Sequence, residues 1–309
     1  MDRTTLAHLP VVVLVARLGS FAAAGGEAGL SPSAVSHAVR VVEAQLGTPL
    51  FTRTTRSVSL TEEGRAFLEI ALPALESLDR AVEEVHQRKG RVAGILRINA
   101  PRAALPMVMS SVIAQLSRDH PELVVEVTSE DALIDIVAAG FDVGIRLGGM
   151  IADDMIAIRM TPPFSAILVA APAYLERAGE PQTVTDLLDH NCIGFKRLSR
   201  GGNYDWELLD EGQDISVAVT GTTRVTEPLL ALDLALAGIG IAYLFEPFVR
   251  SHLKTGALSQ VLSDAAIEEP GLFLYFSKHV RDLPKIRALI EAVRELTGRA
   301  IAARDSANT

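Results

Sequence analysis

The first 60 residues carry helix start and stop signals at such short intervals that only small, closely joined helices can form between them. Ser20 precedes a segment expected to be helical over 21–28, and Gly29 follows it. Ser31 and Pro32 then open a segment that extends to about residue 46. Serine is a favoured N-cap, proline is favoured at the first helical position, and glycine is favoured just past a helix end. The pattern predicts two helices joined by a short turn, a helix-turn-helix.

Two features weaken this pattern locally. Pro10 lies in an earlier apolar segment that ends at Gly19, so it is expected near the first position of that helix or as a break in its first turn. Gly25 and Gly26 lie inside the next helix, where each glycine is expected to cost roughly 1 kcal/mol of helix stability.

A hairpin and a long helix are predicted next. Threonine and valine over 51–60 favour extended structure, which suggests a small β-hairpin wing. A helix is expected over 61–89, where apolar residues recur at steps of three and four, as in a heptad seam. Two interpretations remain open for this seam: a coiled-coil dimer contact, or packing on the helix's own domain. Pro73 is expected to kink the helix or to reduce its stability. The seam residues are Leu68, Ala71, Leu75, Leu78, Val82 and Val85.

The remaining chain alternates between strand and helix signals. Strands are expected over 95–100, 123–128 and 142–147, with helices over 104–118 and 133–139. Residues 160–163 (MTPP) break the alternation, and a second set follows, including expected elements at 165–171, 187–188, 192–195, 217–221, 229–237 and 239–245. A strand over 272–276 and a helix over 284–296 come last. This order argues for parallel sheets covered by helices.

Four motifs carry a resemblance to a known family: residues 19–24 (GSFAAA), 30–36 (LSPSAVS), 46–53 (LGTPLFTR) and 60–64 (LTEEG). Their order and spacing resemble the N-terminal domain of LysR-type transcriptional regulators. Residues 94–98, 142–146, 190–193 and 237–242 resemble the effector domain of that family. The two internal glycines and Pro73 depart from the family's usual pattern.

The resemblance implies an α/β fold: an N-terminal winged helix-turn-helix, a long linker helix and a two-lobed, periplasmic-binding-protein-like effector domain. The expected boundaries are 1–60 for DNA binding, 61–89 for the linker or dimerisation helix, and 90–303 for the effector-binding domain. Lobe I is expected at 90–162 and 267–303, and lobe II at 163–266.

DNA reading requires short hydroxyls and one or two longer donors on an exposed helix face, with arginines in the wing for phosphates or a narrow minor groove. The whole chain has a net charge of −9, which excludes a protein that binds DNA by bulk positive charge. Residues 31–60 nevertheless hold three arginines against one glutamate, a net charge of +2. The candidate DNA contacts are Ser33, Ser36, His37, Arg40, Thr52, Arg53 and Arg56.

By analogy with the family, a small-molecule effector is expected between the lobes, at strand ends and helix N-termini. Arg102 either holds a carboxylate or is a surface arginine, and Glu130 either binds an amine or pairs with Arg102. Arg146 is more readily a structural arginine. The candidate effector contacts are Pro101, Arg102, Ser129, Glu130, Gly148, Phe195 and Thr226.

The resemblance implies the partners as well: a promoter dyad in double-stranded DNA, a small-molecule effector, a homodimer that assembles further into a homotetramer, and RNA polymerase if the protein is an activator. No cofactor, metal or membrane is expected, and neither is catalysis. The single cysteine, Cys192, permits no intrachain disulfide, which fits a reducing cytoplasm, and no secretory signal is recognised.

Three enzyme readings are weak. Residues 238–243 (GIGIAY) lack the third glycine of a dinucleotide fingerprint, and a helix precedes them where a strand is required. His190 and Cys192 have no evident orienting partner for a thiol nucleophile. The histidines show no metal-ligand spacing. Two other classes stay open: a solute-binding or transport module, and an architectural DNA binder without a ligand.

Overall fold

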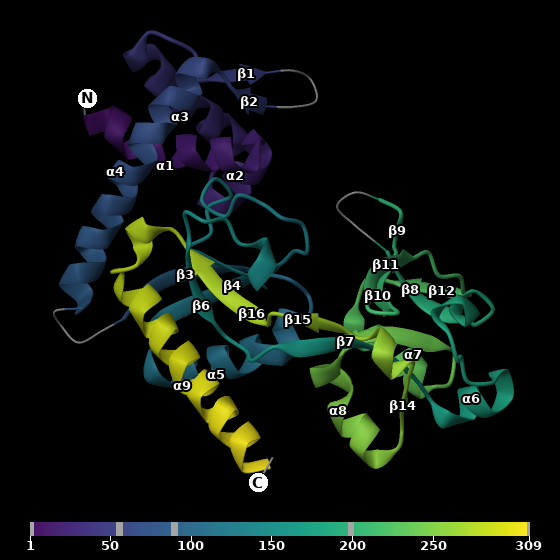
Figure 1. The fold of residues 1–309 in the computed structure, drawn as a ribbon. Helices are drawn as coiled ribbons and strands as arrows, with labels where there is room; N and C mark the ends of the chain where they lie inside the picture. The colour runs from purple at the N-terminus through teal and green to yellow at the C-terminus, as the bar shows by residue number, and fades with distance from the viewer. Residues whose placement is uncertain (1–2, 54–57, 88–91, 197–200, 308–309) are drawn as a thin grey trace. The chain divides into compact units, whose positions relative to one another are not determined.

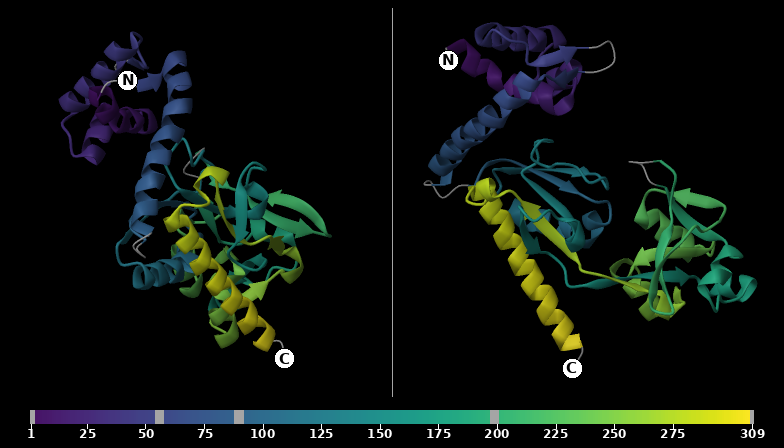
Figure 2. Two further views of the ribbon diagram at one scale, coloured as in Figure 1. Left: turned by 90° about the vertical axis from the view of Figure 1, so that its left-hand side faces the viewer. Right: turned by 45° about the horizontal axis from the view of Figure 1, so that its top comes forward.

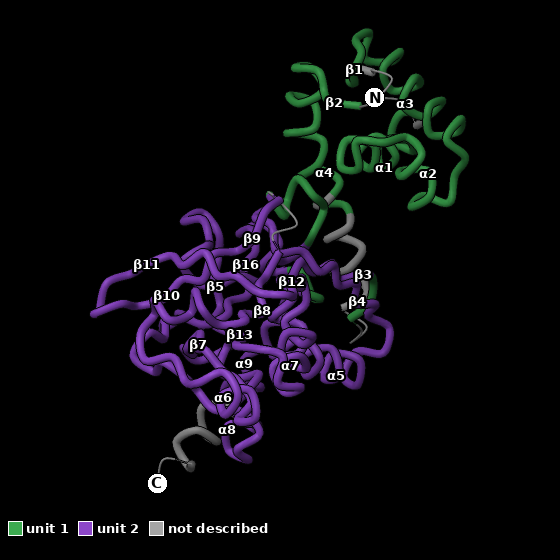
Figure 3. Tube along the Cα trace, turned by 90° about the vertical axis from the view of Figure 1, so that its right-hand side faces the viewer, with its two compact units in different colours: residues 1–94, 135–141, 283–285 green, residues 95–134, 142–282, 286–309 purple. Residues whose placement is uncertain are grey.

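The computed structural model describes residues 3–53, 58–87, 92–196 and 201–307 (Figure 1). The chain divides into two compact units (Figure 3). One contains residues 1–94 with 135–141 and 283–285, and the other contains 95–134, 142–282 and 286–309. In the described part of the chain, no helix is both long and apolar enough to cross a membrane.

The N-terminal unit contains three helices, a hairpin and a long helix. These are α1 (Arg3–Leu18), α2 (Phe21–Ala28), α3 (Pro32–Leu46), β1 (Phe51–Arg53) paired antiparallel with β2 (Val58–Leu60), and α4 (Glu62–Gln87). The hairpin and the two helices of the predicted helix-turn-helix therefore form as the sequence indicates.

The expected caps are present in this unit. Ser20 Oγ accepts from the Ala23 N–H at 3.3 Å, and Ser31 Oγ accepts from the Ala34 N–H at 3.2 Å. Gly29 ends α2 with a φ of 66°, a left-handed conformation that favours glycine. These local hydrogen bonds satisfy backbone groups that would otherwise be unpaired at the helix ends.

The expectation for Pro10 was wrong, whereas the kink or loss of stability expected at Pro73 stays a prediction. Pro10 lies in the interior of α1, well past its first turn, and α4 is one helix across Pro73. Pro73 and Glu69 are both exposed, so water can bind the Glu69 carbonyl that lacks an N–H partner at position 73. The lost backbone hydrogen bond does not end α4 at Pro73.

The second unit, which we call the effector unit after the function that the family resemblance implies, has two lobes, each built on a sheet. Lobe I has the strand order β4-β3-β5-β16-β6, comprising β4 (Leu123–Ser129), β3 (Gly94–Ala100), β5 (Val143–Leu147), β16 (Leu272–Phe276) and β6 (Ile156–Arg159). Its helical elements are the π-helix η1 (Leu105–Met109), α5 (Ser110–Asp119), α9 (Pro284–Ala307) and the short 3-10 turns η2 (Gly148–Met150) and η5 (Lys278–Val280).

Lobe II has the strand order β12-β8-β13-β7-β14, with β15 added to β7 and β9 added to β8. Its strands are β7 (Phe164–Ala170), β8 (Cys192–Lys196), β9 (Asn203–Tyr204), β12 (Thr223–Val225), β13 (Ile241–Phe245), β14 (Ser259–Val261) and β15 (Ile267–Glu269). A separate hairpin consists of β10 (Trp206–Asp210) and β11 (Gln213–Val217). The helical elements are α6 (Pro172–Ala178), η3 (Val184–Leu188), α7 (Pro228–Leu236), α8 (Glu246–Thr255) and η4 (Ser263–Ala265).

The sheets are mixed, not parallel as expected. In lobe I β16 runs antiparallel to β5, and in lobe II β7 runs antiparallel to β13. Both strands enter their sheet from the other lobe, at the edge where the parallel strands end (Figures 1 and 2). A strand that starts at that edge must run the opposite way.

Three further expectations were wrong. Residues 133–139 do not form a helix: Asp135 Oδ1 accepts from the N–H groups of Val137 and Ala138, both at 3.0 Å, and Gly140 then turns the chain with a φ of 75°. Residues 217–221 do not form one strand, because β11 ends at Val217 and β12 begins at Thr223. β15 pairs with β7, so residues 267–269 lie in lobe II and not in lobe I.

Candidate functional site: a DNA-reading face and an interlobe cleft

The predicted DNA face lies on α3. Val35, Val39 and Val42 are fully buried on the opposite side of this helix. Ser33, His37 and Arg40 are therefore turned outward and exposed, as the 3.6-residue period requires, whereas Ser36 is only half-exposed.

Two contacts order this face. Ser31 Oγ and Ser33 Oγ are 2.9 Å apart, so Ser33 is held beside the N-cap. Arg40 Nε donates to the Ser36 carbonyl at 3.3 Å, which lays the guanidinium along the helix while its terminal nitrogens remain available. The face therefore offers hydroxyl, imidazole and guanidinium groups in a row along one helix.

The wing is attached directly to α3. Glu43 Oε1 accepts from the N–H groups of Leu50 and Phe51 at 2.9 and 3.2 Å. Thr52 is exposed on β1. Arg53 is the last residue of β1, but its side chain and all of Arg56 lie outside the described structure. Glu43 is the one acidic residue in segment 31–60, and it connects α3 to the wing through these hydrogen bonds.

The predicted seam of α4 divides into two groups. Leu68 and Leu75 pack on the core of the N-terminal unit, and Ala71 is half-buried. Leu78 is 59% exposed, and Ile70, which the seam omits, is 77% exposed. Val82 and Val85 belong to the part of α4 whose side chains are not described. The contacts favour packing on its own domain for Leu68 and Leu75, and leave Ile70 and Leu78 uncovered.

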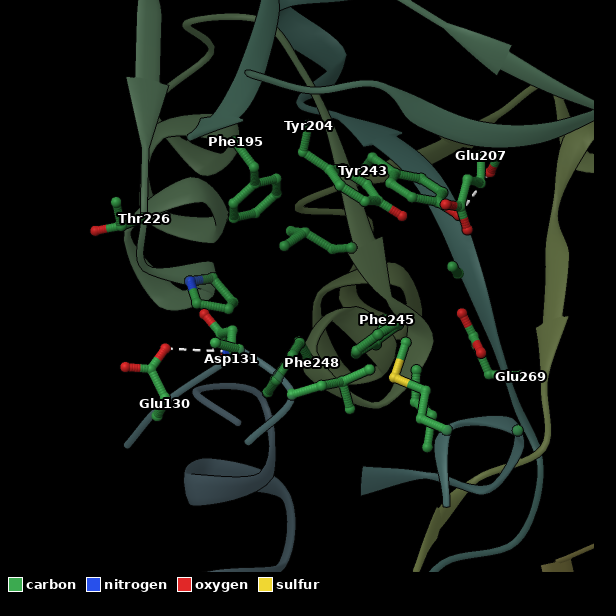
Figure 4. Close-up of a pocket in the computed structure, with 18 of the residues that line it drawn as sticks. Glu130, Asp131, Phe195, Tyr204, Glu207, Thr226, Tyr243, Phe245, Phe248 and Glu269 are labelled. Atoms are coloured by element: carbon green, nitrogen blue, oxygen red, sulfur yellow. Dashed lines mark hydrogen bonds between the residues drawn. The ribbon is translucent and has the colours of Figure 1, made fainter. Parts of the chain in front are cut away.

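A cleft of about 960 Å³ lies between the two lobes of the effector unit (Figure 4). Residues 130–133, 147, 149 and 150 of lobe I contribute one wall, and lobe II contributes the other. Of the seven predicted contacts, the lining includes Glu130, Phe195 and Thr226. The other four, Pro101, Arg102, Ser129 and Gly148, are not in the described lining.

Arg102 bridges the two lobes. Its guanidinium forms ion pairs with Asp131 of lobe I and, at 2.8 Å, with Glu227 at the start of α7 in lobe II. Its backbone N–H also donates to Asp131 Oδ1 at 2.9 Å. Although desolvation lowers the pKa of Arg102, the hydrogen bonds to these two carboxylates raise it overall. The residue that could have held a ligand carboxylate is thus already paired.

Arg146 is structural in this geometry. It is almost fully buried on β5, donates to Asn99 Oδ1 at 2.6 Å and to the Ala132 carbonyl at 2.7 Å, and has no ion pair within the described residues. Burial lowers its pKa, while Asp131 and Glu130 act in the opposite direction. Arg146 therefore fixes the loop that carries the lobe I wall, and its charge offsets the acids there.

The prediction missed most of the cleft's chemistry. The far wall carries aromatic and acidic side chains: Tyr204, Glu207, Tyr243, Phe245, Phe248 and Glu269. They come from β9, β10, β13, α8 and β15, which are far apart in sequence. Only the cluster Phe245-Glu246-Pro247-Phe248 gave a local signal, an aromatic pair beside a proline at a helix start.

The weak enzyme readings gain no support. Cys192 is buried, and burial raises its thiol pKa to about 12, so little reactive thiolate exists near neutral pH. A Cβ at Gly240 would clash with the Asn191 carbonyl, so this glycine permits a close approach between two backbone segments. Among the described residues, no group of three His, Cys, Asp or Glu side chains could hold a metal ion.

Two parts of the chain match known protein families. Residues 6–65 match the family described as "Bacterial regulatory helix-turn-helix protein, lysR family". Residues 89–298 match the family described as "LysR substrate binding domain". The two matches coincide with the segments that carry the DNA-reading face and the cleft.

Individual relatives match along nearly the whole chain. The chain is 36% identical to the uncharacterized HTH-type transcriptional regulator YcaN of Escherichia coli (strain K12), over 94% of this chain and 95% of that protein. It is 34% identical to the HTH-type transcriptional regulator PgrR of the same strain, over 89% and 92% respectively. The full-length structure of the Vibrio cholerae virulence activator AphB matches the fold with a TM-score of 0.63 at 23% identity, over 96% of this chain and 100% of that chain. The chain therefore belongs to the LysR family of transcriptional regulators.

Proposed function

We propose that the protein is a homo-oligomeric regulator whose α3 helices read the two halves of a promoter dyad, and whose DNA binding changes when a small molecule enters the cleft. The observation that carries the proposal is the exposed row of Ser33, His37 and Arg40 on a capped helix, in the same chain as a cleft of ligand size. Dyad recognition follows from pairing two such heads, because each head covers one half-site.

In this proposal the candidate residues of α3 and of the wing contact different parts of the DNA. Ser33, His37 and Arg40 contact base edges or phosphates in the major groove. Ser36, which is half-buried on α3, also contacts the DNA. Thr52, Arg53 and Arg56 of the wing meet the phosphate backbone or the minor groove. The rest of the chain is acidic and repels DNA. This repulsion orients the protein so that the helix-turn-helix and wing face the DNA.

The two heads are joined through the uncovered side of α4, around Ile70 and Leu78. The effector unit pairs again to give a tetramer, in line with what the family resemblance implies. A ligand acts only if it binds one lobe arrangement more tightly than the other, and the Arg102–Glu227 pair between the lobes is one contact that such a change would alter. Neither a cofactor nor catalysis is part of this function.

The experiment is a mobility-shift titration of full-length protein at several salt concentrations, on genomic fragments selected by the protein itself. Arg40→Ala is expected to lower affinity for the selected site about tenfold or more, the size of one lost base or phosphate contact. Arg118→Ala, an exposed arginine on α5, is the matched control and should behave as wild type. Wild-type affinity and salt dependence for Arg40→Ala would remove α3 from the DNA contact.

A further inference from the structure

Among the residues that the structure describes, the lining of the cleft has more acidic than basic side chains. Four residues of its described lining are acidic, Glu130, Asp131, Glu207 and Glu269, and one, the exposed Lys196, is basic. A cleft lined by one sign of charge concentrates ions of the other sign. Which ligand it favours depends on which of these carboxylates already has a counter-charge.

The acids of lobe I are compensated. Asp131 forms an ion pair with Arg102. Glu130 Oε1 accepts from the Ala132 N–H at 3.0 Å, and both acids lie close enough to the buried Arg146 to act on its pKa. Together with Glu227, which also pairs with Arg102, this end of the cleft has three carboxylates and two guanidinium groups near one another.

The acids of lobe II are not compensated within the described residues. No lysine or arginine described there lies within ion-pair distance of Glu207 or Glu269. Glu207 projects from β10 between the buried Trp206 and Leu208, hence away from the core. Glu269 is the last residue of β15, where the chain leaves for lobe I. Figure 4 shows both side chains at the same end of the cavity.

Aromatic rings complete this end of the cleft. Tyr243 Oη donates to the backbone carbonyl of Glu207 at 2.7 Å, which fixes the ring beside the two acids. Tyr204 lines the same wall, and the rings of Phe245 and Phe248 are stacked with centroids 6.3 Å apart. Aromatic faces attract cations and also bury apolar groups.

We propose that the effector carries a protonated amine that binds between the carboxylates of Glu207 and Glu269, and an apolar body that packs on the aromatic side chains of the cleft. This inference rests on the proposed ligand-responsive function and names the chemical class of its ligand. An anionic effector would be repelled at this end by two carboxylates that have no counter-charge among the described residues.

The pKa of Glu269 fits this assignment. Burial, and then the neighbouring Glu207, raise the pKa of Glu269 above its ordinary value, so its ionised form is unfavourable without a partner. A bound ammonium group would remove that penalty by pairing with both carboxylates.

The test compares three probes of nearly equal size: phenethylamine, 2-phenylethanol and phenylacetate. Binding to the full-length protein is measured by calorimetry and by the shift of the thermal unfolding midpoint. Phenethylamine is expected to bind best. Glu269→Gln and Glu207→Gln should each weaken its binding about tenfold, the size expected for a hydrogen bond to a charged group. Glu268→Gln and Asp210→Asn change exposed acids outside the described lining and serve as controls.

A preference for phenylacetate, equal responses to all three probes, or wild-type binding of phenethylamine by both glutamine variants would overturn the proposal. Each variant retains the size of the wild-type side chain, and its folding is checked by its own unfolding midpoint. The same preparations are assayed for DNA binding. Loss of the amine preference with specific DNA binding intact contradicts only the ligand class, whereas absence of specific DNA binding contradicts the proposed function.

Discussion

Gly25 and Gly26 are neighbours in α2, but their surroundings differ. A Cβ at Gly25 would meet the Leu30 carbonyl at 2.7 Å, so a glycine is required where α2 approaches the turn before α3. A Cβ at Gly26 would meet nothing within 4 Å. The sequence predicts a helix-stability cost for both residues, but helix propensity alone cannot distinguish a required glycine from a merely unfavourable one.

The pair makes a matched prediction. Gly26→Ala is expected to raise the free energy of unfolding by about 0.5–1 kcal/mol, because alanine loses less backbone entropy in a helix. Gly25→Ala is expected to lower it by at least about 1 kcal/mol, because its methyl group overpacks the turn. Urea unfolding of the two variants checks this. Similar stabilisation by both would show that α2 can move away from the turn.

Glu269 gives a pH-dependent prediction. Its pKa is raised in the folded protein, so ionising the carboxyl lowers the free energy of unfolding. Below the ordinary pKa of 4.5 the carboxyl is protonated in both the folded and the unfolded state, and this loss of stability is absent. Glu269→Gln is therefore expected to be more stable than wild type at pH 7, by roughly 0.5 kcal/mol given the partial exposure of the pair, and equal to it near pH 4.

Urea titrations at the two pH values measure the difference, and Glu268→Gln is the control. A stability gain that grows as the pH falls would reverse the sign and contradict the raised pKa. Glu207 and Tyr243 are the charged or titratable neighbours whose variants should alter the effect.

The sequence predicted the helix ends well, because they depend on neighbouring residues. It did not predict which distant residues meet in the cleft. Ser20, Ser31 and Gly29 act on backbone groups within a few residues, so their roles can be deduced from the sequence alone. Glu207 and Glu269 are 62 residues apart and meet only because β10 and β15 both border the cleft. No spacing rule in the sequence connects them.

Helices and strands show the same division. The capped helices and the wing formed where predicted, whereas 133–139 had the composition of a helix but a hydrogen-bonded turn at Asp135 took its place. The heptad pattern predicted the apolar face of α4 correctly. Such a face can pack on a partner subunit or on the helix's own domain, and the pattern does not distinguish the two. Contacts decide between them, and Leu75 contacts its own core.

The two faces of α4 predict different consequences for similar substitutions. Leu78→Asp is expected to reduce the assembly size in sedimentation, because it places a charge on the uncovered face. Leu75→Asp is expected to lower the free energy of unfolding by roughly 2–3 kcal/mol, because it removes a partly buried leucine and buries a charge. An unchanged oligomer for Leu78→Asp, both in the full chain and in a fragment of residues 1–90, would show that this face is not the dimer contact.

The effector unit is organised by two chain crossings between its lobes. Residues 160–163 lead into lobe II, and Pro270-Gly271 lead back. The crossings are in direct contact, since Leu272 N–H donates to Thr161 Oγ1 at 2.9 Å and a Cβ at Gly271 would meet the Thr161 carbonyl at 2.7 Å. The prolines of residues 160–163 located the first crossing in the sequence. The second was predicted three residues too early, before β15, because nothing in that short strand indicates which lobe it joins. The paired crossings and the Arg102 ion pair with Glu227 both join the two lobes.

The most direct measurement is a footprint of the full-length protein, at controlled salt, on DNA flanking its own coding region. The account predicts two protected half-sites related by a dyad and separated by whole helical turns, with protection lost in Arg40→Ala and retained in Arg118→Ala. Weak, unpatterned protection that disappears as salt rises, on this DNA and on genome-wide selected fragments alike, would contradict the claim that two α3 helices read a dyad.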